Sequence, residues 1–121
     1  MTSGVQTILY PVKDLASAKA LFTALSGQQP YMDQPYYVAF TVDGQDVGLN
    51  PHGHQQGMAG PVPFWHVEDI KASLHALLDA GATVLEDVKD VGGGKLVASV
   101  KDADGNGLGL IQDARHDPSR V

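Results

Sequence analysis

The two halves of this sequence repeat one pattern, and this duplication restricts the possible folds more than any other feature. Residues 12–15 (VKDL) match residues 67–70 (VEDI), and both segments lead into a predicted helix. Further along each half, residues 43–44 match residues 104–105, each an Asp-Gly pair typical of tight hairpin turns. Because helix starts, turns and strand order agree, we infer a duplicated unit with the order β-α-β-β-β.

Each unit has a clear helix signal after its first strand. Asp14 and Asp69 stand where helix caps are expected, and apolar residues then recur at three- and four-residue spacing. Unit one, about residues 5–50, has strands predicted over 5–12, 36–42 and 46–50 and a helix over 15–26. Unit two, about residues 61–112, has strands predicted over 62–67, 83–91, 95–100 and 108–112 and a helix over 70–80.

The repeat predicts one α+β domain over residues 1–121. Its two tandem β-α-β-β-β units are expected to form a half-barrel-like curved sheet with the helices outside. Residues 51–60 are a glycine-containing linker, and residues 113–121 are polar and expected to form a loose tail. Two twisted units placed edge to edge leave a concave trough, which is a natural site for a small molecule.

Composition excludes several kinds of partner and site. The chain has 121 residues, with 8 Lys and Arg against 14 Asp and Glu, and no two basic residues are adjacent, so nucleic acid is not an expected partner. No apolar run is long enough to cross a bilayer, and the first residues lack a secretory signal, so we expect a cytoplasmic protein without a membrane partner. The absence of cysteine excludes disulfides and thiolate chemistry.

Familiar catalytic and nucleotide-binding motifs are absent. There is no Gly-x-Ser-x-Gly, Walker or Rossmann motif, so the sequence does not predict a hydrolase or a nucleotide-binding protein. The three glycines at 92–94 link two predicted strands and do not open a helix, so we interpret them as a hairpin or a mobile lid.

The sequence resembles the vicinal oxygen chelate superfamily, which includes glyoxalases, bleomycin-resistance proteins and extradiol dioxygenases. The resemblance rests on the duplicated order, the V-x-D-[LI] entry to each helix and the closing DADGN turn at 102–106, and it covers about residues 5–112. It implies two units paired around a ligand, and it implies a homodimer. Enzymes of the group hold a divalent metal with side chains from the first and last strands of each unit.

The metal ligands that the resemblance implies are missing from this chain. The first-strand position is Thr7, and its equivalent in unit two falls near Val62 or Pro63. The last-strand position in unit two is Gly109, and its partner in unit one is Gly48, or Leu49 if the register slips by one. Only the Thr7 hydroxyl offers a donor, and it is a weak one, so we expect no metal and no other cofactor.

Aromatic and polar residues on or beside the strands are the candidates for ligand binding. Tyrosine and tryptophan combine an apolar body with a polar tip, which suits the wall of a pocket for a flat molecule. The predicted ligand-binding residues are Tyr36, Tyr37, Asn50, His54 and Trp65. His66 alternates with Trp65 along one strand, so one of the two is expected in the trough and the other on the helix side.

These residues support three hypotheses for function. The first is a metal-free protein that binds a small, flat organic molecule in an aromatic-lined trough. The second is a lyase, isomerase or dioxygenase whose metal is held by other residues, such as His52, His54 or His66. The third is a metal-free enzyme with Asp46 or a tyrosine as acid or base, and Asp46 and His66 are the candidate catalytic residues.

Overall fold

The computed structural model describes residues 2–113, and its elements follow the predicted duplicated order. They are β1 (Thr2–Pro11), α1 (Leu15–Ser26), β2 (Met32–Gln34), β3 (Tyr37–Val42), β4 (Gln45–Asn50), β5 (Val62–Val67), α2 (Ile70–Asp79), β6 (Thr83–Asp90), β7 (Leu96–Lys101) and β8 (Gly107–Gln112). The predicted tail lies outside the described residues, apart from Asp113. Neither helix of the described part is long and apolar enough to cross a membrane.

Both predicted helix caps are confirmed. The Asp14 carboxylate accepts a hydrogen bond of 3.0 Å from the Ser17 N–H, and the Asp69 carboxylate accepts one of 3.1 Å from the Ala72 N–H. Gly27 ends α1 in the left-handed region, with φ at 71°, where a residue without a Cβ is favoured. These local signals fix where each helix begins and therefore which side chains it turns toward the sheet.

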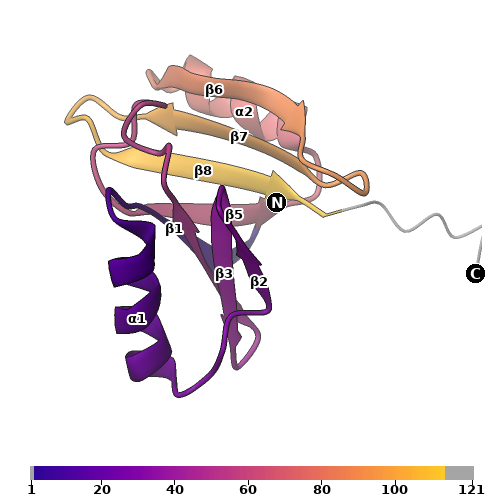
Figure 1. Cartoon of the computed structure of the whole chain (residues 1–121). Coiled ribbons are helices and arrows are strands. Elements are labelled where there is room, and N and C mark those ends of the chain that lie inside the picture. Colours follow the sequence, from indigo (N-terminus) through magenta and orange to yellow (C-terminus); the bar gives the residue numbers. More distant parts are fainter. Residues whose placement is uncertain (1, 114–121) are drawn as a thin grey trace, which may run out of the picture.

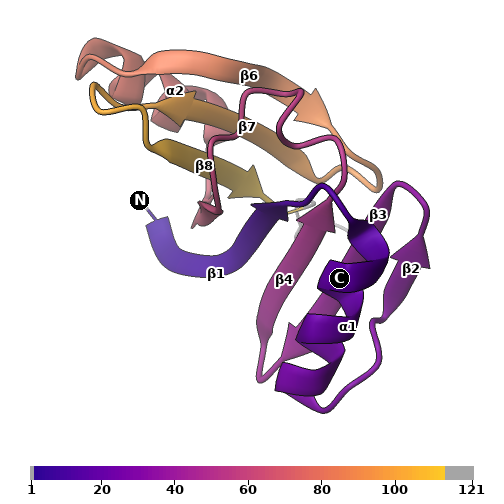
Figure 2. The same ribbon diagram turned by 60° about the vertical axis from the view of Figure 1, so that its left-hand side comes forward.

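All eight strands form one sheet in the order β2-β3-β4-β1-β5-β8-β7-β6 (Figure 1). β1 and β5, the first strands of the two units, pair antiparallel and join the units at the centre of the sheet. The sheet is curved and does not close, so β2 and β6 remain as its two edges (Figure 2). The predicted fold class and the half-barrel-like arrangement of the units are therefore confirmed.

The strand register shows the duplication residue by residue. In unit one, Leu9 of β1 pairs with Gly48 of β4. In unit two, Phe64 of β5 pairs with Gly109 of β8 in the same parallel manner. The two first strands then pair with each other in a symmetric way, because Thr7 faces Phe64 and Leu9 faces Val62.

Both helices cover the same face of the sheet. α1 packs on a buried cluster of Val38, Phe40 and Leu49, and α2 contributes Ile70 and Leu74 to a second one. The rest of that second cluster comes from β7 and β8, namely Ala98, Val100 and Leu110. Since strand side chains alternate, the neighbours of these core residues point to the opposite face, which neither helix covers.

Candidate functional site

Residues on the uncovered side of the central strands form what we call the open face, and it corresponds to the predicted trough. One row of paired residues crosses the sheet from β3 to β7 on this face. The row consists of Thr41, Asp46, Thr7, Phe64, Gly109 and Ser99. The next row, from β3 to β8, consists of Ala39, Gly48, Leu9, Val62 and Gly107. Of the positions implied for metal ligands, Thr7, Gly48, Val62 and Gly109 thus lie on neighbouring strands of one face, whereas Pro63 points to the other face.

The two last-strand positions are covered by aromatic side chains. A Cβ added at Gly48 would lie 2.1 Å from the Tyr37 hydroxyl oxygen and 2.8 Å from Leu9 Cδ1. A Cβ added at Gly109 would lie 2.4 Å from the Phe64 ring. Both glycines are buried beneath these neighbours. The space from which a ligand side chain would start is therefore already filled in both units.

The residues present do not fit a divalent metal at these positions. Phe64 lies between Thr7 and Gly109 in the first row, and its side chain has no donor atom. Val62 lies in the next row, where it packs toward Gly107. The Thr7 hydroxyl is already hydrogen-bonded to His66. Within residues 2–113, no three side chains of the His, Asp, Glu or Cys type gather into a group that could hold a metal ion.

Unit one contributes a polar, aromatic corner to the open face. Burial, followed by the nearby Tyr31 and Asp46, raises the pKa of Tyr37 to about 12, because burial and negative charge both disfavour the phenolate. Burial and then Asp46 also raise the pKa of Tyr31. Asp46 itself accepts a hydrogen bond of 2.9 Å from the Thr41 hydroxyl. The Tyr37 hydroxyl thus keeps its proton at neutral pH and is a hydrogen-bond donor.

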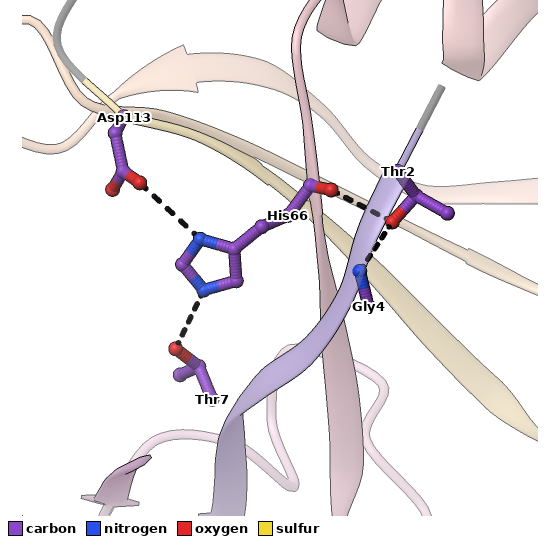
Figure 3. A network of polar contacts seen from close by, with 5 residues as sticks. All are labelled: Thr2, Gly4, Thr7, His66 and Asp113. Carbon is purple, nitrogen blue, oxygen red and sulfur yellow. Dashed lines mark hydrogen bonds and ion pairs between the residues drawn. The ribbon is translucent and has the colours of Figure 1, made fainter. Parts of the chain in front are cut away.

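His66 is the centre of a hydrogen-bonded network on the open face (Figure 3). Its Nε2 lies 3.1 Å from the Thr7 hydroxyl, and its Nδ1 lies 3.3 Å from the Asp113 carboxylate. The Thr2 hydroxyl donates a hydrogen bond of 2.7 Å to the His66 carbonyl and accepts one of 3.0 Å from the Gly4 N–H. The imidazole is therefore held at both ring nitrogens, and the backbone of His66 is held by the start of β1.

The predicted residues after β4 organise a turn. The Asn50 side chain accepts a hydrogen bond of 2.8 Å from the His52 N–H and donates one of 3.0 Å to Gln56 Oε1. His54 lies exposed in this turn, and Tyr36 is 60% exposed just before β3. Both polar ends of Asn50 are thus used within the chain, and ligand binding by Asn50, His54 or Tyr36 stays a prediction.

Trp65 lies on the other side of the sheet from His66. It lines a shallow apolar groove together with Thr2, Ser73, Leu77 and Leu110, next to α2, and it is 37% exposed. The expectation that one of the two residues faces the trough is confirmed, and the one that does so is His66. A ligand on the open face would not touch Trp65, so its predicted role would require binding at this groove.

The link between Thr7, His66 and Asp113 was not predicted from the sequence. These residues lie in β1, in β5 and just after β8, so no spacing along the chain connects them. In the sequence, Asp113 belongs to the predicted polar tail, and Thr7 stands out only as a weak metal donor. The link depends on β1 and β8 lying on either side of β5, which no signal in the sequence specifies.

Comparisons with known proteins identify the fold. No protein-family model and no curated protein matches the sequence. The structure is similar to a glyoxalase/bleomycin resistance protein/dioxygenase superfamily member from Vibrio splendidus 12B01, with a TM-score of 0.69 and 19% identity over 93% of this chain and 100% of that chain. It is also similar to methylmalonyl-CoA epimerase from Mycobacterium tuberculosis, with a TM-score of 0.64 and 16% identity over 94% and 90% of the two chains.

A third similar structure is the Mn(II)-bound glyoxalase from Novosphingobium aromaticivorans. Its TM-score is 0.70 and its identity is 18%, over 98% of this chain and 43% of that chain. The chain therefore has the vicinal oxygen chelate fold, as the sequence resemblance implied. At these levels of identity the similarity concerns the fold, and the site must be judged from the chain's own residues.

Proposed function

We propose that this protein binds a small organic molecule on its open face, without a metal ion at the positions that metal-dependent proteins of this fold use. The covering of Gly48 by Tyr37 and of Gly109 by Phe64 supports this most directly. A divalent cation in a protein is held by several oxygen, nitrogen or sulfur donors, and these positions supply only the Thr7 hydroxyl.

The ligand that this face suits is flat and carries a hydrogen-bond acceptor. The ring of Tyr31, which is 63% exposed, and the ring of Phe64 offer apolar surface at the two sides of the central strands. The Tyr37 hydroxyl provides a donor beside Gly48, and no hydrogen bond to another described residue occupies it. Aromatic walls with a few placed polar groups are the usual composition of a small-molecule site.

A metal-dependent enzyme and an enzyme with Asp46 as acid or base have less support. Both ring nitrogens of His66 have partners, and His52 and His54 lie in the turn after β4, so the three histidines do not form a metal site together. Asp46, the proposed acid or base, is hydrogen-bonded to Thr41. Reversible binding needs none of these groups to react, which is why we favour it.

We also propose that the protein is a homodimer and has neither a nucleic-acid nor a membrane partner. A chain of this size forms a single pair of units, and a second copy would bury further apolar surface. Leu21 and Leu25 on the outer side of α1 are 68% and 81% exposed, which provides such surface. The net charge of −6 opposes binding to nucleic acid and to anionic lipids. The cytoplasmic location stays a prediction.

A ligand screen with matched variants tests the binding proposal. Saturation-transfer NMR with a library of phenols, indoles and other flat aromatic fragments should find ligands whose binding is unchanged by EDTA. Tyr37→Phe should weaken the best fragment by about tenfold, as expected for one lost hydrogen bond. Tyr10→Phe is the control, because Tyr10 packs against Phe22 at 5.0 Å on the helix side. Fragments that bind only with added Mn²⁺ or Zn²⁺, or no binding at all, would overturn the proposal.

A further inference from the structure

Three polar side chains from distant parts of the sequence form a connected line on the open face (Figure 3). Thr7 Oγ1 lies 3.1 Å from His66 Nε2, and His66 Nδ1 lies 3.3 Å from Asp113 Oδ2. His66 has a side-chain exposure of 12%, whereas Asp113 is 66% exposed. The line therefore runs from the exposed Asp113 carboxylate through the shielded His66 imidazole to the half-buried Thr7 hydroxyl on the open face.

When the His66 ring is neutral, its two partners determine which ring nitrogen carries the proton. A carboxylate only accepts hydrogen bonds, so Nδ1 of His66 carries the proton and donates a hydrogen bond to Asp113. In the neutral ring Nε2 is then an acceptor, and the Thr7 hydroxyl donates to it. An imidazole that is oriented by a carboxylate and accepts from a hydroxyl is the arrangement that activates a hydroxyl for nucleophilic attack, whatever fold carries it.

An irregularity in β1 places Thr7 in this line. The pairing of β1 with β5 shifts between Val5 and Thr7, so Gln6 is an extra residue without a partner. As a result Thr7, and not Gln6, faces Phe64 and points to the same side as His66. Bulges of this kind re-aim side chains and are frequent next to active sites.

We propose that Thr7 is a nucleophile that accepts acyl groups from neutral aryl esters, with His66 as its general base and Asp113 as the residue that positions His66. In the first step Thr7 Oγ1 forms a bond to the ester carbonyl carbon while its proton passes to His66 Nε2. The bond from that carbon to the aryl oxygen breaks, and the leaving phenolate takes the proton from Nε2. In the second step water attacks the acyl-threonine, its proton passes to Nε2 and then to Thr7 Oγ1, and a carboxylic acid leaves.

The surroundings of Thr7 select this class of ester. Phe64 is its neighbour on one side and offers a flat apolar surface to an aromatic leaving group. Asp46 is its neighbour on the other side, and its carboxylate disfavours an acyl group that carries a negative charge. A phenolate leaves readily without strong stabilisation, so an aryl ester makes smaller demands on the site than an alkyl ester or an amide. Reversible binding of a ligand does not require acyl transfer. An experiment can therefore disprove the acyl-transfer activity without disproving the proposed binding function, and the reverse also holds.

The test uses p-nitrophenyl acetate with the intact chain. Release of p-nitrophenolate is followed by absorbance, and the protein is then examined by intact mass and by peptide mapping. The expected result is one acetyl group on Thr7 when the reaction is stopped with acid after a short incubation. Acetylation confined to lysine side chains, or release without modification of Thr7, would overturn the proposal.

Variants separate catalysis from folding. Thr7→Val should abolish release, and Thr7→Ser, which keeps the hydroxyl, should retain it; each variant is checked by its melting curve. His66→Ala should slow release about 100-fold or more, the usual contribution of a general base. Thr83→Val makes the same chemical change at the exposed start of β6 and should have no effect. Equal rates in Thr7→Val and Thr83→Val would refute the assignment.

The role of Asp113 has its own spectroscopic signature. Asp113→Asn places an amide N–H opposite Nδ1, so the ring should move its proton to Nε2 and lose its ability to accept from Thr7. Long-range ¹H–¹⁵N spectra should show the Nδ1–H form of His66 in the original protein and the Nε2–H form in Asp113→Asn, together with slower release. An unchanged tautomer would show that Asp113 does not position His66.

Discussion

Replacing Gly109 by alanine is the sharpest test of how the open face is built. The added Cβ would lie 2.4, 2.5 and 2.6 Å from three carbons of the Phe64 ring, and real Cβ atoms do not come this close to a neighbour. Gly109 has no positive φ, so its backbone accepts alanine without strain and the whole effect is steric. At an open position the same change stabilises a protein by about 0.4–1 kcal/mol, through the unfolded state. Overpacking instead destabilises it by about 1–3 kcal/mol.

We therefore expect Gly109→Ala to lower the free energy of unfolding by about 1–3 kcal/mol. Urea denaturation followed by the fluorescence of Trp65, the chain's single tryptophan, measures this quantity. Gly60→Ala is the matched control, because a Cβ there meets nothing within 4 Å and its φ is not in the left-handed region. It should leave stability unchanged or raise it.

A double-mutant cycle identifies the cause. In a Phe64→Ala background the ring is gone, so Gly109→Ala should cost nothing further, and the coupling between the two sites should be about 1–3 kcal/mol. The reasoning is refuted if Gly109→Ala is as stable as the original protein, or if it costs the same in both backgrounds.

Three other predictions each concern a single residue. The pKa of Tyr37 is raised to about 12 from 10.0, so the folded state holds this proton more tightly, and the resulting stability is complete below pH 10 and is lost as the pH rises toward 12. Tyr37→Phe should flatten that alkaline loss in urea titrations, and an unchanged pH profile would contradict the assignment. Asp69→Ala should cost about 1 kcal/mol through loss of the α2 cap, whereas Asp79→Ala at the other end of α2 should cost nothing. Leu25→Glu should convert the proposed dimer to a monomer in sedimentation velocity, and a dimer that survives it would place the interface elsewhere.

The fold was largely predictable because its signals are local. Asp14 and Asp69 start the helices by capping them, and Asp-Gly turns close matching hairpins in both units. The short strand β2 was not delimited in advance, because Asp33 and Gln34 have low strand propensity and tertiary pairing with β3 decides the outcome. Helix caps and turns depend on neighbours in the sequence, whereas an edge strand depends on its partner.

The site was predictable only in part, because its geometry depends on pairing between strands. The positions that the resemblance implies for metal ligands were located by counting from the helix caps and the closing turn, and the register places Thr7, Gly48, Val62 and Gly109 on one face. What fills these positions was not predictable. Tyr37 covers Gly48 from the neighbouring strand β3, and Phe64 covers Gly109 from β5, and neither contact leaves a trace in the spacing of residues along the chain.

The two units cover their last-strand glycines with different side chains, so the two halves of the open face differ in polarity. In unit one a tyrosine hydroxyl covers the glycine, beside Asp46 and Thr41, so that half is polar. In unit two a phenylalanine ring covers the glycine, so that half is apolar. A duplicated fold would otherwise present the same surface to a ligand in two equivalent orientations. Because a molecule with one polar and one aromatic end matches the two halves in only one orientation, the asymmetry selects how a ligand lies across Thr7 and His66.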